Sequence, residues 1–143
     1  MKRRTIIWLA IAGLAVVGLS TCSISLFQTL DGATKAALVT ANAAAEEFEI
    51  SGITMPALKS YATPEYYAAL EAEGPTSVDK FQLLGGVTSI ADCLLIAVDI
   101  TNGVGTSQAA CPAVFDRGKA SLVMNLYSPV GGPWKISSLG IQI

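Results

Sequence analysis

Histidine is absent from all 143 residues of this chain. Its absence removes the side chain that most often acts as a general base near neutral pH and most often binds transition metals. It also removes every Ser-His and Cys-His pair that activates a nucleophile. We therefore expect the protein not to be an enzyme of these common classes.

Cysteine is scarce as well. The chain has only Cys22, Cys93 and Cys111, which are widely separated and form no Cys-x-x-Cys motif. Zinc and iron–sulfur sites need clustered thiolates or imidazoles, so neither site is expected. The sequence therefore predicts no metal and no cofactor.

Positive charge is limited and unevenly placed. Three of the nine Lys and Arg residues, Lys2, Arg3 and Arg4, lie at the extreme N-terminus, and six remain against eleven Asp and Glu. Nucleic acids and anionic lipids are bound by clustered positive charge, which the remainder of the chain lacks. We expect no nucleic-acid partner.

One long uncharged run spans residues 6–27, directly after the basic tip. A helix of about 20 apolar residues spans a bilayer, and positive residues before it favour a cytoplasmic N-terminus. The sequence thus predicts a basic tip and signal-anchor helix over 1–28. A domain over 29–143 would then lie in the periplasm or another extracytoplasmic space, attached to the bacterial inner membrane.

Two alternatives for this N-terminus stay open. A cleaved signal peptide would use the apolar stretch 6–19, although no clear small-x-small cleavage site follows it. A lipoprotein would carry lipid on Cys22, because residues 19–22 resemble a lipobox except for Thr21. All of these alternatives export the domain to an oxidising compartment.

The first half of the domain, residues 31–86, is predicted to be helical. Residues 33–50 are strong helix formers after a predicted cap at Asp31, and Gly52 is a predicted stop. The alternative is a helix that runs almost directly out of the membrane segment, with Gly32 as the joint. An apolar stripe along this helix predicts the face that packs on a sheet. The stripe comprises Leu38, Ala41, Ala45 and Phe48.

Shorter helices follow this long one. Thr54 and Thr63 are each followed by an early proline, which predicts helices over about 55–61 and 64–73, the second ending at Gly74. A further short helix is expected from Ser77 to about residue 84. Aromatic residues concentrate here, and they either line a pocket or close one end of the core. We favour core closure for Tyr61, Tyr66, Tyr67 and Phe81.

The second half, residues 87–143, is predicted to form four antiparallel strands. These are expected at 88–100, 106–115, 119–127 and 134–143, joined by turn-rich segments such as Asn102-Gly103. The alternation in the first strand predicts one inward face, made of Ile90, Leu94, Ile96, Val98 and Ile100. The last strand changes its alternation of apolar residues at Ser137-Ser138, which predicts a β-bulge. A bulge increases local twist, so the sheet is expected to be curved.

The first hairpin makes a prediction about the cysteines. If it pivots on Asn102, the numbers of opposed residues sum to 204, which places Cys93 opposite Cys111. Opposed Cβ atoms lie roughly 4.5–5.5 Å apart, close to the separation that a disulfide needs. We predict a Cys93–Cys111 disulfide; the alternative is a pair of free buried thiols.

Together these elements predict an α+β fold, in which a long helix and short helices pack on a curved four-stranded antiparallel sheet. The segments 44–48, 61–66, 81–85, 118–126 and 132–136 resemble small domains of the NTF2-like (cystatin-like) superfamily. In that superfamily a long helix packs into a cone-shaped sheet. A pilin-like arrangement is the alternative, but the N-terminus lacks the prepilin pattern.

The NTF2-like resemblance implies either a binding module or an enzyme with acidic and tyrosine groups in the cone. Asp92 is expected on the inner face of the sheet, where burial would raise its pKa and allow it to act as a base in an isomerase or hydrolase. The alternative is that Asp92, near the start of the strand, reaches solvent, a helix N-terminus or a backbone amide. A small-molecule pocket would be lined by Tyr66, Phe81, Asp92 and Trp134. Filling of the cone by Leu38, Phe48 and Leu84 would remove such a pocket.

The leading hypothesis is a membrane-anchored, non-catalytic binding or assembly domain, attached through residues 6–27 and working with a protein partner. The small-molecule binder is the second hypothesis, and the enzyme built on Asp92 is the third.

Overall fold

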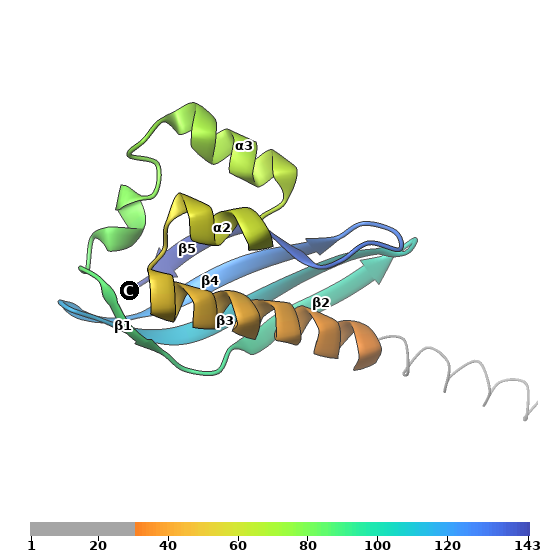
Figure 1. Cartoon of the computed structure of the whole chain (residues 1–143). Coiled ribbons are helices and arrows are strands. Elements are labelled where there is room, and N and C mark those ends of the chain that lie inside the picture. Colours follow the sequence, from red (N-terminus) through yellow and green to blue (C-terminus); the bar gives the residue numbers. More distant parts are fainter. Residues whose placement is uncertain (1–30) are drawn as a thin grey trace, which may run out of the picture. The chain divides into compact units, whose positions relative to one another are not determined.

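The computed structural model describes residues 31–143, and Figure 1 shows their arrangement. Residues 34–143 form one compact unit. It is an α+β fold with helices packed on an antiparallel sheet, as predicted. Among the described residues no helix is both long and apolar enough to cross a membrane. The predicted anchor over 6–27 and the question of Cys22 lie outside the described residues.

The long helix extends to residue 51 and already includes residues 31 and 32. The prediction that Asp31 caps it is therefore wrong. Its end is as expected, because Gly52 adopts φ 76° and its N–H donates to Phe48 O at 2.9 Å. The predicted stripe is the buried face. Ala37, Ala41, Ala44, Ala45 and Phe48 are 5 % exposed or less, and Leu38 packs at the margin of the core.

Two short helices follow, at the predicted positions. Helix α2, Met55–Tyr61, is capped by Thr54, whose hydroxyl accepts from Ala57 N. Helix α3, Pro64–Glu73, is capped in the same way by Thr63 and ends at Gly74. The expected helix after Ser77 is only the 3-10 turn η1, Asp79–Gln82. These elements contribute Leu58, Leu70 and Phe81 to the core.

The sheet contains five strands rather than the predicted four. The expected strand over 88–100 is divided into β1, Val87–Ile90, and β2, Leu94–Thr101, which both pair with β3, Val104–Phe115. Strand β4, Gly118–Ser128, pairs with the other side of β3, and β5, Lys135–Gln142, forms the opposite edge.

The division between β1 and β2 also changes which residues face the core. Residues 91–93 leave the strand, and a bulge at Ile96 shifts the register again. Ile90, Val98 and Ile100 keep the predicted inward positions, opposite core-facing residues of β3. Leu94 and Ile96 do not: they are 68 % and 61 % exposed, so the prediction that they face inward is wrong.

The final hairpin has the predicted bulge. Asn125 pairs with Ser138 and Leu126 pairs with Ile136, which leaves Ser137 as the extra residue. This insertion keeps Ile136, Leu139 and Ile141 on the same face, opposite Leu126, Met124 and Leu122. Without it, the alternation of a strand would send one group of these side chains to the wrong face.

Candidate functional site

The interior of the domain is filled. Its largest fully buried side chains come from both layers, so the helices and one face of the sheet meet in a continuous core. They are Phe48, Leu58, Leu70, Leu122, Met124, Leu126, Ile136 and Cys111. Of the residues expected to fill the cone, Phe48 is fully buried and Leu38 packs against the core, whereas Leu84 stays partly exposed.

The four residues predicted to line a pocket lie in separate places. Phe81 is 3 % exposed within the core, and its edge touches an open groove of about 290 Å³ beside β5. Trp134 packs its ring over Gly105, where an added Cβ would lie 2.5 Å from Trp134 Cη2. Tyr66 lies at the edge of β5, where its hydroxyl contacts Leu139 N. Asp92 is exposed in the break between β1 and β2.

The expected role of Asp92 on the inner face is therefore corrected. The sequence pattern places it in phase with Ile90 and Leu94, but the chain leaves the strand at residues 91–93 and turns this side chain outward. Asp92 borders a groove of about 380 Å³ together with Glu46 and Glu49 of the long helix. Within residues 31–143, no group of three or more His, Cys, Asp or Glu side chains is placed to hold a metal ion.

Tyr66 closes part of one sheet edge. Its hydroxyl oxygen accepts a hydrogen bond from Leu139 N at 3.1 Å, and Thr63 N donates to Ile136 O at 2.8 Å on the same edge. Burial raises the pKa of Tyr66 above its ordinary value, and the nearby negative charge of Glu73 raises it further; the bond from Leu139 opposes both effects. Its position makes Tyr66 a structural residue of the edge.

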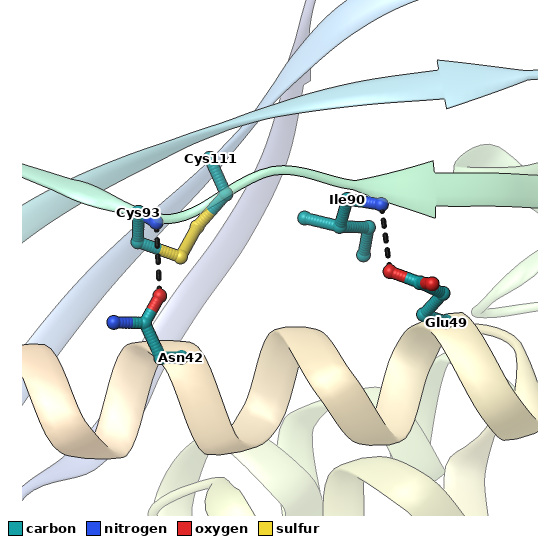
Figure 2. Close-up of a disulfide and its surroundings, with 5 residues drawn as sticks. All are labelled: Asn42, Glu49, Ile90, Cys93 and Cys111. Atoms are coloured by element: carbon teal, nitrogen blue, oxygen red, sulfur yellow. Dashed lines mark hydrogen bonds between the residues drawn. A yellow bond between two sulfur atoms is a disulfide. The ribbon is translucent and has the colours of Figure 1, made fainter.

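The opposite edge is closed by the long helix, as Figure 2 shows. Asn42 Oδ1 accepts from Cys93 N at 2.9 Å, and Glu49 Oε2 accepts from Ile90 N at 2.9 Å. Ile90 is the last residue of β1, and Cys93 is the last residue of the break before β2. Sequence reasoning missed both roles. Asn42 and Glu49 are polar residues spaced two turns apart, but only the folded structure shows which amides they reach.

The predicted disulfide is confirmed. Cys93 and Cys111 are bonded, with their Cα atoms 4.1 Å apart and a sequence separation of 18. Next to the cysteines, Leu94 pairs with Ala110, so the numbers of the opposed residues sum to 204, as expected. Nearer the turn at Asn102 and Gly103, the numbers of paired residues sum to 205 instead. The extra residue at the Ile96 bulge changes this sum to 204 before the strand reaches Cys93.

The remaining functional candidate is the sheet face opposite the helices, which we call the open face. No helix of the described chain packs on it, because the helices all contribute to the core on the other face. Its side chains project from alternating positions of β2 to β5. The large apolar ones that are exposed are Leu94, Val114 and Tyr127.

A hydrogen-bonded polar row crosses the open face. Gln108 Nε2 donates to Asn125 Oδ1 at 3.2 Å, and Asn125 Nδ2 donates to Ser138 Oγ at 2.6 Å. Open grooves lie on both sides of the middle of the face, with volumes of about 430 Å³ and 480 Å³. These features describe a shallow, mixed surface suited to contact with another macromolecule.

The helical layer and the sheet layer differ in net charge. Residues 31–86, which form the helical layer, carry eight acidic and three basic side chains, whereas residues 87–143 carry three of each. The strand register places Asp99, Lys119 and Lys135 on the open face, which is therefore close to neutral, and the excess negative charge lies in the helical layer.

Comparison with known proteins adds no relative. No family model, curated protein or solved structure matches this chain.

Proposed function

We propose that this protein is a membrane-anchored, non-catalytic binding or assembly module whose described domain lies outside the cytoplasm. The observation that carries the proposal is the contrast between a filled interior and an uncovered sheet face. A domain that binds a small molecule usually keeps a concave, mostly apolar pocket. Here the apolar volume is used for packing, and the exposed surface is left for contact.

Two further observations support the location. The Cys93–Cys111 disulfide is typical of proteins in oxidising compartments. The uncharged run over 6–27, preceded by Lys2, Arg3 and Arg4, has the length and flanking charge of a signal anchor. An NTF2-like relationship is part of this proposal; it is supported by the long helix that packs across one face of a bulged sheet.

Fractionation of cells that express the full chain tests the proposal. We expect the protein to sediment with membranes, to resist extraction by alkaline carbonate and to be released by detergent. A variant without residues 1–28, carried to the same compartment by a cleavable signal peptide, should be soluble. External protease should digest residues 29–143 in spheroplasts while a cytoplasmic control protein stays intact.

Recovery of the full chain in the soluble fraction would contradict the anchor. The intact mass of the purified protein separates the remaining alternatives, because cleavage and lipid attachment at Cys22 each change the mass in a known way. Purification from detergent-solubilised native membranes would then identify any bound protein. A chain recovered alone and monomeric would contradict the assembly function.

A further inference from the structure

The open face has complementary halves. The strand pairing places Asp99 on β2, Thr106 on β3, Tyr127 on β4 and Lys135 on β5 in a single row. An acidic side chain thus lies at one end of the row and a basic side chain at the other. The two outermost strands are separated by three strand spacings, roughly 14 Å, which is too far for an ion pair within one copy.

A second row has ends of complementary shape, one bulky and one without a side chain. Leu94, Ala110, Val123 and Gly140 pair in sequence across the same strands. Leu94 is 68 % exposed at one end, and at the other end a Cβ built on Gly140 meets no atom within 4 Å. A large apolar side chain and an empty position therefore lie at opposite ends of one row.

From these rows we propose that the open face binds a second copy of this chain, face to face, about a two-fold axis that runs along the strands between β3 and β4. Such an axis exchanges β2 with β5 and β3 with β4 while it keeps each row in place. Asp99 then faces the second copy's Lys135, and Leu94 faces the space above the second copy's Gly140. Each contact occurs twice, as an isologous interface requires.

Charge and area both favour a second copy as the partner. Face-to-face packing brings the near-neutral faces together and keeps the two acidic helical layers on opposite outer sides, where they repel least. The face offers on the order of 600 Å² per copy, estimated from strand spacing and rise, which is near the lower end of stable interfaces.

This inference rests on the proposed membrane anchor in one respect. Two copies anchored in one membrane through residues 6–27 would meet at a raised effective concentration, which favours self-association. In the single copy Lys135 Nζ donates an exposed hydrogen bond to Ser60 O of α2 at 3.2 Å, so the contact with the second copy's Asp99 requires Lys135 to leave that bond.

Variants that reverse the charge of Asp99 or Lys135 test the proposal. Full-length chains in detergent or nanodiscs are labelled with donor or acceptor dyes, and energy transfer is measured against concentration. Asp99→Lys and Lys135→Asp should each weaken self-association by about tenfold or more, because like charges then face each other. A mixture of the two variants should associate like the unmodified chain, and so should the double variant, because each restores opposite charges.

Two further variants keep the test specific. Gly140→Leu should abolish association without unfolding the monomer, because the added side chain enters open space in one copy and meets Leu94 of the second copy. Glu71→Lys makes the same charge change as Asp99→Lys on the exposed surface of α3 and should leave association unchanged. Circular dichroism confirms the fold of each variant.

A membrane-bound chain that stays monomeric at every concentration would overturn the dimer but leave the anchor intact. Association that is unaffected by Gly140→Leu, or not restored in the mixture of charge variants, would also overturn it. Release of the full chain from membranes overturns the anchor instead, and it is measured independently by fractionation.

Discussion

The long helix uses polar side chains to satisfy backbone amides that no neighbouring strand reaches. Asn42 and Glu49 accept from Cys93 and Ile90 at the edge formed by β1 and β2. Unpaired strand edges promote uncontrolled pairing with other chains, and natural proteins cover them or interrupt them. Here the helix that fills the core also closes part of the edge.

Asn42→Ala should remove the acceptor for the Cys93 amide. Because this amide is partly buried, its loss should lower the free energy of unfolding by about 1–2 kcal/mol and speed hydrogen exchange at Cys93. Asn42→Asp is the matched control, since its carboxylate can accept the same bond. Unchanged exchange at Cys93 in the alanine variant would contradict this role.

Tyr66 should make stability depend on alkaline pH. Its folded-state pKa is raised from 10.0, so below about pH 10 the phenol is protonated in both the folded and unfolded states. As pH rises further, the unfolded state loses the proton first, and the free energy of unfolding falls until the folded-state pKa is passed. Denaturant titrations at several pH values measure this slope.

Tyr66→Phe is the control for that titration. The variant lacks the ionisable hydroxyl, so it should lose stability less steeply above pH 10 than the unmodified protein. At neutral pH it should be about 1 kcal/mol less stable, because Leu139 N loses its acceptor. Equal alkaline slopes in the two proteins would exclude Tyr66 as the group responsible.

At the scale of the secondary-structure elements, the packing of β5 depends on one extra residue, Ser137. Ser137 lies at the bulge that keeps Ile136 and Leu139 on the core face, where they are 0 % and 8 % exposed. The bulge therefore has a packing role, which the change of alternation at Ser137-Ser138 already indicated in the sequence.

Deletion of Ser137 should shift the register of β5 against β4 either before or after the bulge. Exposure of Ile136 or Leu139 should then cost about 2–5 kcal/mol of unfolding free energy, measured by urea denaturation. Ser137→Ala retains the residue count and removes only the bond from its hydroxyl to Asn125 O, so it should cost less than about 1 kcal/mol. Similar losses in both variants would argue against a register role.

For the whole molecule, the disulfide limits the freedom of the unfolded chain. It closes a loop with a sequence separation of 18, and both cysteines are buried. Cys93→Ala with Cys111→Ala should lower the free energy of unfolding by about 2–4 kcal/mol. Reductant should destabilise the unmodified protein under denaturing conditions and leave the double variant unchanged. Alkylation of Cys93 and Cys111 in the native, unreduced protein would contradict the bridge.

Charge and apolar surface are also distributed at the scale of the whole molecule. The helical layer holds the excess of acidic residues, whereas the near-neutral open face holds Leu94, Tyr127 and the polar row. This separation leaves one extended surface on which association is not opposed by like charge. Both the proposed module and its proposed self-association depend on this surface.

Local chemistry explains why much of the fold was predictable. Threonine caps followed by proline determine where α2 and α3 begin, and Gly52 and Gly74 determine where helices end. Asn102-Gly103 determines the first hairpin because both residues tolerate positive φ. These signals act within a few residues, so the sequence alone was sufficient to determine them.

Long-range contacts decided the rest. The break at residues 91–93 and the bulge at Ile96 arise where the strand must meet both β3 and the long helix, and they turn Asp92, Leu94 and Ile96 outward. Alternation within one segment carries no information about such partners, because a single inserted residue reverses every later side chain. By itself the sequence determined α2, α3, the strands β3 to β5, the cysteine pair and the bulge in β5. Only tertiary packing decided that the interior is filled and that the functional candidate is the open face.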